Sequence, residues 1–271
     1  MELGSPHLTD GQFKAISRLV YDICGISLNN GKKSLVRARL MKRLRALRMQ
    51  SFREYLRYLE SEAGRGEIDF MIDVITTNKT NFFREIDHFD FLRTCVLPTL
   101  RGTRLRFWCA ACSSGEEPYS LAMVLRESLI GMDWKDVRVL ATDISTRMLK
   151  RARAASYTEE AVQEIPSPMR RKYFDIIQRD GQCYYMLKMN VRSLVSLGCL
   201  NLMGPWPMKG PFDVIFCRNV MIYFDRPTQQ RLVQRFWELL RPEGYLFVGH
   251  SEGLSGVVHR FQYVQPAVYR K

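Results

Sequence analysis

The sequence predicts an α/β protein in which an all-helical N-terminal domain precedes a doubly wound α/β domain. Apolar residues recur every three or four positions over about the first eighty of the 271 residues, which is typical of helices. After about Pro98, strand-like apolar runs alternate with helical stretches, as in a sheet covered by helices. Asp180-Gly181 lies between two apolar runs and indicates a tight hairpin. It predicts a small antiparallel β-subdomain inserted at about residues 172–200.

The N-terminal domain is expected to hold four helices. Thr9 or Asp10 can cap the first helix, whose apolar residues continue to Ile23 and which Gly25 ends. Three further helices are expected, at residues 33–48, 52–59 and 67–75. The polar segment that follows the last of them closes the helical domain.

The α/β domain is expected to form its sheet from strands at residues 105–109, 137–141, 212–217, 245–249 and 261–269. Helices are expected between them, around residues 121–125, 146–154 and 229–240. Arg241–Gly244 contains Pro and Gly and therefore predicts a turn before the fourth strand. Val191–Val195 predicts a strand that pairs beside the hairpin of the β-subdomain.

The charge balance predicts an anionic partner. Lys and Arg number 41 against 28 Asp and Glu, a net charge of +13, which suits nucleic acid, an acidic membrane surface or an acidic protein. No apolar run approaches the roughly 20 residues that a membrane span needs. Met1–Pro6 lacks the basic-then-apolar layout of a signal peptide. We therefore expect a cytoplasmic protein without membrane insertion.

The seven cysteines are expected to be reduced thiols, because an odd count without an export signal argues against a disulfide framework. Cys109 and Cys112 form a C-x-x-C pair, for which a metal or redox role is the alternative. A structural zinc site would need a second pair or suitably spaced histidines, and the four histidines lie far apart in the sequence. We therefore expect no metal.

Ligands of open α/β sheets bind beyond the carboxyl ends of the strands, and the first such end leads into Gly115-Glu116-Glu117. Two carboxylates here would repel phosphate and suit a phosphate-free ligand with positive charge, such as S-adenosyl-L-methionine. The alternative is that both glutamates only complement the helix dipole. Asp143 ends the second strand, where an acidic residue typically binds ribose hydroxyls or, alternatively, caps a helix. Arg218 and Asn219 end the third strand and should project into the same crevice.

Four sequence blocks resemble the CheR family of chemotaxis receptor methyltransferases, which are protein-glutamate O-methyltransferases. The blocks follow the order of that family, and the resemblance covers nearly the whole chain. They are TTNKTNFFRE at residues 76–85, SGEEPYS at 114–120, FCRNVMIYF at 216–224 and GHSE at 249–252.

This resemblance implies a helical N-terminal domain over residues 1–80, a linker with cofactor contacts over 81–98, and a Rossmann-like methyltransferase domain over 99–271. It implies S-adenosyl-L-methionine as methyl donor and S-adenosyl-L-homocysteine as product. The expected partner is the cytoplasmic helical bundle of methyl-accepting chemotaxis receptors, whose glutamates become methyl esters. A glutamate side chain has an unperturbed pKa of about 4.3 and is already ionised at neutral pH, so its methylation needs no general base. Alignment of the reactants and exclusion of water suffice for catalysis.

The resemblance also implies individual roles. Asp143 should hold the ribose, Asn201 and Leu202 should border the adenine, and Arg218 with Asn219 should line the methionine end. Further cofactor contacts are implied for Asn78, Thr80, Arg84 and one of Glu116 and Glu117. Tyr223, beside the methyl group, and Arg84 are the candidates for catalytic contacts. His250 belongs to a signature block and is either functional or structural.

The expected helix at residues 33–48 carries six basic residues between Arg37 and Arg48, and the sequence between Lys32 and Ser51 holds no acidic one. We expect this face to dock on the acidic receptor helices through Arg39, Lys42 and Arg43. Some family members also bind a C-terminal receptor peptide through a longer, glycine-containing loop of the β-subdomain. The turn at Asp180-Gly181 is tight here, which predicts no tethering by that pentapeptide.

Two other functions fit a basic Rossmann-like protein. A nucleic-acid methyltransferase commonly uses an N-P-P-Y-like strand end, whereas the equivalent place here reads Arg218-Asn219-Val220-Met221. No nucleic-acid partner is therefore expected. A non-catalytic, cofactor-sensing adaptor for acidic helical bundles is the remaining alternative, and measured turnover separates it from the enzyme.

Overall fold

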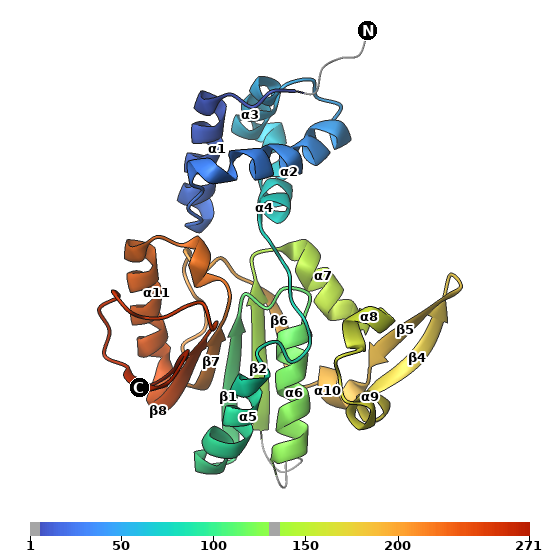
Figure 1. Cartoon of the computed structure of the whole chain (residues 1–271), viewed down its shortest axis with the longest axis vertical. Coiled ribbons are helices and arrows are strands. Elements are labelled where there is room, and N and C mark those ends of the chain that lie inside the picture. The colour runs from blue at the N-terminus through green and yellow to red at the C-terminus, as the bar shows by residue number, and fades with distance from the viewer. Residues whose placement is uncertain (1–5, 130–135) are drawn as a thin grey trace. The chain divides into compact units, whose positions relative to one another are not determined.

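The computed structural model describes residues 6–129 and 136–271, and the chain divides into two compact units (Figure 1). The helical unit comprises the residues up to Thr77 together with Tyr223–Asp225. The α/β unit comprises Asn78–Ile222 and Arg226–Lys271. Residues 1–5 lie outside the described residues. They make up most of Met1–Pro6, the segment in which the layout of a signal peptide was sought above.

The helical unit begins with α1 (Asp10–Cys24), and both expected boundary signals are confirmed. The Thr9 side chain accepts a hydrogen bond from the Gln12 N–H, and Gly25 ends the helix with a left-handed φ of 72°. These contacts satisfy backbone groups that a helix end leaves unpaired. Phe13, Ile16 and Val20 form the buried face of this helix.

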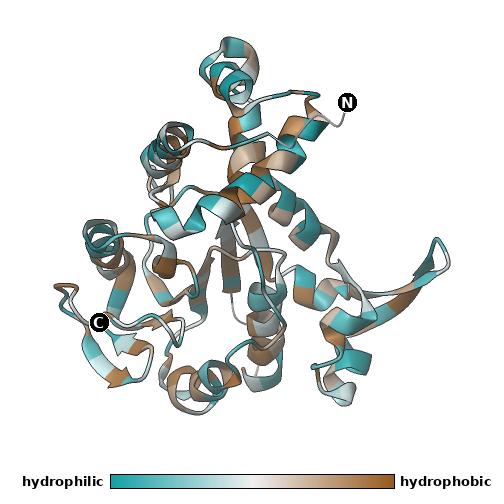
Figure 2. Ribbon diagram, turned by 45° about the horizontal axis from the view of Figure 1, so that its top comes forward, coloured by the Kyte–Doolittle hydropathy of each residue, from teal (hydrophilic) through white to brown (hydrophobic). Residues whose placement is uncertain are grey.

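Three further helices of the helical unit match their expected positions. They are α2 (Lys33–Ala46), α3 (Phe52–Glu60) and α4 (Glu67–Ile75). Each buries residues three or four apart, such as Val36, Leu40 and Leu44 of α2. In Figure 2 the helices carry both teal and brown residues, in keeping with one buried and one exposed face.

The α/β unit is built on a seven-stranded sheet in the order β6-β2-β1-β7-β8-β10-β9. The first five strands in this order pair in parallel, and β10 pairs antiparallel with both β8 and β9. Their bounds are β1 (Arg104–Ala110), β2 (Asp136–Asp143), β6 (Val195–Cys199), β7 (Phe212–Cys217), β8 (Leu240–Val248), β9 (Gln262–Gln265) and β10 (Val268–Arg270). The chain passes from β1 outward to β2 and β6, then crosses to β7 on the other side of β1. This reversal is the doubly wound arrangement, and it confirms the expected fold class.

The helices between these strands position the strand ends. They are α6 (Glu116–Ser128) after β1, α7 (Thr146–Ala154) after β2 and α11 (Arg226–Leu239) after β7. The segment before β1 is helical as well, with α5 (Ile86–Phe91) and two short helices, Leu92–Val96 and Leu97–Thr99. β7 is buried along its whole length, as expected for a central parallel strand.

The predicted hairpin forms between β4 (Phe174–Arg179) and β5 (Gln182–Leu187). Its two-residue loop has left-handed φ angles at Asp180 (49°) and Gly181 (72°), as the favoured hairpin turn requires. β3 (Ser156–Tyr157) adds a third strand, and the short helices α8 (Glu159–Val162) and α9 (Ser167–Tyr173) connect it to β4. The small antiparallel β-subdomain is therefore confirmed, with a strand that precedes the expected start at about residue 172.

The strand expected at Val191–Val195 beside the hairpin is wrong. Met189–Arg192 forms the helix α10, and Val195 begins β6, which pairs in parallel with β2 of the large sheet. Val191 and Leu194 are buried in the core of the α/β unit. Their apolar character serves this core and does not indicate a strand next to the hairpin.

Two further boundaries differ from expectation. Arg241–Gly244 lies inside β8, where the pairing with β7 is irregular and Glu243 has a φ of 65°. The Glu243 N–H donates to the Lys271 carbonyl oxygen, and the Lys271 N–H donates to the Gly244 carbonyl oxygen. These hydrogen bonds hold the turn-like sequence within the sheet. The single closing strand expected at 261–269 is two antiparallel strands, β9 and β10, which turn at Ala267 with a φ of 63°.

Among the residues that the structure describes, no helix combines the length and apolar character needed to cross a membrane.

Candidate functional site

The loop after β1 is shaped for close packing at the carboxyl end of the sheet. Gly115 has a φ of 100°, a conformation that favours glycine. A Cβ atom at this position would lie 2.9 Å from the Tyr119 ring and 3.0 Å from the Tyr157 hydroxyl. Ser113 also has a positive φ, 49°. Such backbone strain concentrates at ligand sites and marks this loop as a candidate.

Asp143 ties the end of β2 to this loop. One of its carboxylate oxygens accepts a hydrogen bond from the Ser113 N–H at 2.8 Å, and the other accepts from the Ser145 N–H at 2.8 Å. The side chain is buried. Asp143 therefore fixes two strand ends against each other, and a contact to ribose would be an addition to this role.

The two glutamates at the start of α6 have different environments. Glu116 is buried and accepts hydrogen bonds from the Ser114 hydroxyl at 2.7 and 3.0 Å, and its burial raises its pKa. Glu117 places Oε2 3.0 Å from Nη1 of Arg218. Burial raises the pKa of Glu117 although Arg218 opposes the rise. Glu116 is thus bound by its own loop, whereas Glu117 faces the end of β7.

Arg218, at the end of β7, is an almost fully buried cation whose side chain is 1% exposed. Its guanidinium lies 3.0 Å from Glu117 and 3.0 Å from Glu85, and it also donates to the Arg84 carbonyl oxygen. The guanidinium lies over the Phe89 ring. Two carboxylates face one guanidinium here, so this group of three side chains carries excess negative charge.

Asn219 and Glu85 extend this group. Asn219 has a left-handed φ of 58° and donates from Nδ2 to Oε1 of Glu85 at 3.1 Å. Burial alone would raise the pKa of Glu85, but Arg218 and Asn219 together lower it. We did not single out Glu85 from the sequence, although it ends the first signature block. Its contacts with Arg218 and Asn219 join residues more than 130 positions apart in the chain.

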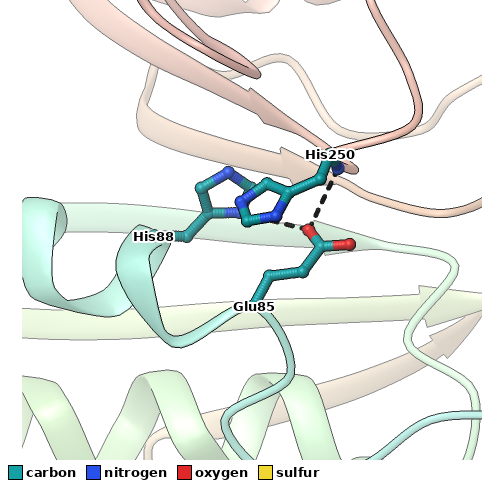
Figure 3. A group of neighbouring side chains, drawn as sticks. All are labelled: Glu85, His88 and His250. Carbon is teal, nitrogen blue, oxygen red and sulfur yellow. Dashed lines mark hydrogen bonds and ion pairs between the residues drawn. The ribbon is translucent and has the colours of Figure 1, made fainter.

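Glu85 is also the centre of a group with two histidines (Figure 3). His88 Nδ1 lies 3.5 Å from Oε2 of Glu85, and the His250 backbone N–H donates to the same oxygen at 3.2 Å. One potential ligand atom from each of the three residues lies within 4.8 Å of the others. The carboxylate already accepts from Arg218 and Asn219, which compete with a cation for its oxygens. Burial lowers the pKa of His88 to about 3, so its imidazole is neutral.

The linker residues lie next to the loop after β1. The Asn78 carbonyl oxygen accepts a hydrogen bond from the Ser113 hydroxyl at 2.9 Å. Arg84 donates to the Lys79 carbonyl oxygen at 3.0 Å, and its own carbonyl accepts from Arg218. Thr80, half-buried, lies between them in the chain. The structure therefore brings two separate signature blocks together.

Asn201 and Leu202 follow β6, the neighbour of β2. The adjoining Leu200 N–H donates to the Asp143 carbonyl oxygen at 3.0 Å, which places this loop beside the end of β2. Asn201 folds its side chain back onto the Met203 N–H at 2.9 Å, and Leu202 is buried. Both residues lie at the same edge of the sheet as Asp143.

Tyr223 belongs to the helical unit. Its carbonyl oxygen accepts from the Ser27 N–H at 2.8 Å, and the ring lies 5.6 Å from the Lys32 ammonium. It lines a cavity of about 110 Å³ in that unit together with Lys32, Arg39 and apolar residues of α2 and α4. The lining of this cavity is mostly apolar and includes two cationic side chains, Lys32 and Arg39.

The basic face of α2 is partly compensated, contrary to the interpretation of its sequence. Arg43 forms a two-point ion pair with Glu67 of α4, and Arg39 donates to the Ile75 carbonyl and the Thr77 hydroxyl. Lys42 is exposed. Helix α2 lacks acidic residues, but the partner comes from another helix. Only Lys42 of the three docking candidates therefore has its charge directed to solvent.

Cys109 and Cys112 are both buried free thiols. Burial raises their pKa values well above the usual range, so the reactive thiolate is strongly disfavoured. Their environment is that of core residues.

Comparison with known proteins shows family matches over both units. Residues 78–270 match the family described as "CheR methyltransferase, SAM binding domain", and residues 11–76 match "CheR methyltransferase, all-alpha domain". A probable chemotaxis protein methyltransferase of Rhizobium etli is 43% identical, over 93% of this chain and 96% of the relative. Chemotaxis protein methyltransferase 2 of Pseudomonas aeruginosa is 41% identical over 97% of this chain and 94% of its own length. The chemotaxis protein methyltransferase of Escherichia coli K12 is 40% identical, over 97% and 91%.

Proposed function

This chain belongs to the CheR methyltransferase family, and we propose that it methylates glutamate side chains of methyl-accepting chemotaxis receptors with S-adenosyl-L-methionine. The observation that carries this proposal is the buried group of Arg218, Glu85 and Glu117 at the carboxyl end of the sheet. Its excess negative charge suits a cationic ligand. The product would be a glutamate methyl ester, and the enzyme would act in the cytoplasm, where the acceptor domain of the receptor lies.

The residues at the strand ends fit the methyl donor. Gly115 lets the loop after β1 pack closely against Tyr119 and Tyr157, and Glu117 with Glu85 offers negative potential at this edge. When bound, S-adenosyl-L-methionine supplies an electrophilic methyl group on a sulfonium. Burial around Arg218 limits water at this edge, which strengthens the electrostatic interactions of the site.

We also propose individual cofactor contacts. Glu117 belongs to the charged group with Arg218, whereas Glu116 accepts from Ser114 of its own loop. We therefore propose that Glu117, and not Glu116, contacts the cofactor. Asp143 would bind the ribose and its neighbours Asn201 and Leu202 the adenine. The remaining cofactor contacts would come from Asn78, Thr80, Arg84, Arg218 and Asn219. Arg84 stays a candidate for a catalytic contact, and so does Tyr223, which belongs to the helical unit, by its place in the third signature block.

The acceptor is an ionised carboxylate and needs no proton removed. The chain's contribution is therefore to align the acceptor and to keep water away from it. The basic surface of α2, through exposed Lys42, would attract the acidic receptor helices. This docking would use the helical unit and would change no contact within the α/β unit.

The decisive experiment uses S-adenosyl-L-methionine labelled in its methyl group and a purified receptor cytoplasmic fragment. We expect label on the receptor that mild alkali releases as methanol, because carboxyl methyl esters are base-labile. Label that resists alkali would indicate nitrogen methylation and contradict the proposal. Cofactor binding without turnover would instead assign a cofactor-sensing adaptor.

We further propose that methylation does not depend on tethering to the receptor's C-terminal pentapeptide. The two-residue turn at Asp180-Gly181 leaves no longer loop on the β-subdomain to hold such a peptide. Full-length receptor and a receptor that lacks the pentapeptide should therefore be methylated with KM values within about twofold. Tight calorimetric binding of the free pentapeptide would contradict this.

A further inference from the structure

The buried carboxylate of Glu252 joins the chain segments that follow β7 and β8. One of its oxygens accepts from the Asn219 N–H at 2.6 Å and from the Gly249 N–H at 2.7 Å. The other accepts from the Ile222 N–H at 3.0 Å. The residue is 5% exposed. Asn219 and Gly249 lie in loops, and Ile222 lies in the first turn of the short 3-10 helix Met221–Tyr223. No strand partner satisfies these three N–H groups.

Gly249 makes this arrangement possible. A Cβ atom there would lie 2.5 Å from Nδ2 of Asn219 and 2.7 Å from Oε2 of Glu252. Both distances are below any contact that a carbon atom tolerates. The Glu252 carboxylate, the Asn219 amide and the bare Gly249 backbone therefore form one interlocked unit, which we call the Glu252 clasp.

The clasp leads directly to the charged group. It fixes Asn219 in its left-handed conformation, and from there Asn219 donates to Glu85. Glu85 in turn faces Arg218 at 3.0 Å and accepts from the His250 N–H at 3.2 Å. Three segments that are distant in the sequence are thus connected through hydrogen bonds that begin at Glu252.

We propose that Glu252 is a positioning residue, which sets Asn219 and, through Glu85, Arg218 in the geometry that binds the methyl donor. The proposal rests on the proposed function, because it takes these residues as cofactor contacts. Charge matters to the clasp, since a carboxylate accepts from several N–H groups at once, whereas an amide presents one accepting oxygen and two donors.

The test compares Glu252→Gln with Glu67→Gln. Both changes neutralise a buried carboxylate that accepts several hydrogen bonds, but Glu67 lies in the helical unit. A second pair of variants needs no change at Glu252: Gly249→Ala inserts a methyl group into the clasp, and Gly11→Ala adds one in open space. The readouts are the Kd for S-adenosyl-L-homocysteine by calorimetry, the thermal midpoint, and KM and kcat for the donor.

We expect Glu252→Gln and Gly249→Ala to raise the Kd and the donor KM at least about tenfold, as loss of a charge-assisted hydrogen bond implies. The kcat at saturating donor should fall much less. Glu67→Gln should lower the thermal midpoint without changing the Kd. If Glu252→Gln does not fold, Gly249→Ala decides. Unchanged Kd in the clasp variants overturns the positioning role alone, whereas no binding by the wild-type chain overturns the proposed function as well.

Discussion

Nε and Nη2 of Arg43 each lie 2.7 Å from one of the two carboxylate oxygens of Glu67. The Tyr55 hydroxyl donates to the same carboxylate at 2.9 Å, and the Glu67 side chain is only 3% exposed. The pair joins α2 to α4 in the interior of the helical unit. Arg43 is therefore held by the fold, which removes it from the surface on which we expected a receptor to dock.

Replacement of Arg43 by Ala should destabilise the helical unit by about 3 kcal/mol, because it leaves the buried charge of Glu67 without its cation. Urea denaturation followed by far-ultraviolet circular dichroism measures this loss. Arg53→Ala, at an exposed position of α3, is the matched control and should change the free energy of unfolding by less than about 0.5 kcal/mol. Equal stability of the two variants would contradict the structural role of Arg43.

Reversal of the exposed charge of Lys42 should weaken receptor docking without destabilising the chain. We expect Lys42→Glu to raise the KM for the receptor fragment by roughly threefold to tenfold at low salt, mainly through slower association. The difference should shrink at high salt, where exposed charges are screened. Arg53→Glu makes the same change in net charge on α3 and should leave the KM near the wild-type value. An equal rise for both variants would point to net charge and not to α2.

Local signals were sufficient for much of the fold. The cap at Thr9, the glycine at Gly25 and the Asp180-Gly181 turn act over a few residues, and each appears where the sequence predicts it. The errors concern pairing between distant segments. The sequence of Val191–Val195 predicts a strand beside the hairpin. In the structure, Met189–Arg192 forms a helix and Val195 begins β6, which pairs with β2 of the large sheet.

The same distinction holds for the site. The expectation that Asp143, Arg218 and Asn219 lie at one edge of the sheet follows from strand topology, which the sequence predicts. The partners of these residues do not follow from it. Glu85 and Glu252 form hydrogen bonds with Asn219, 134 and 33 positions away, and no local pattern contains that information.

The stability of the α/β unit should fall below neutral pH because His88 is buried as a neutral imidazole. Burial and the nearby Arg218 lower its pKa from 6.5 to about 3, so the unfolded chain takes up a proton first. The contribution of neutral His88 to the free energy of unfolding is complete above pH 6.5 and is lost as the pH falls toward 3. Between pH 6.5 and 5 the loss should reach about 2 kcal/mol.

His88→Phe keeps an aromatic ring beside Phe247 and removes the titrating group. Urea denaturation at several pH values between 7.5 and 5 should show a flatter dependence for this variant. His7→Gln, at an exposed position, should retain the wild-type slope. A wild-type slope in His88→Phe would assign the acid sensitivity to other groups.

Arg218→Lys should weaken cofactor binding even though it conserves the charge. The planar guanidinium contacts Glu117 through Nη1 and Glu85 through Nη2, each at 3.0 Å, and an ammonium cannot reproduce this fork. One of the two carboxylates would lose its hydrogen bond to residue 218, at a cost of about 1.5–3 kcal/mol for a hydrogen bond to a charged group. We therefore expect the Kd for S-adenosyl-L-homocysteine to rise by roughly tenfold to a hundredfold. Arg241→Lys, which affects a single ion pair with Asp213 at the opposite end of the strands, should leave that Kd unchanged. Unchanged affinity in Arg218→Lys would show that the fork between Glu85 and Glu117 is not needed to bind the methyl donor.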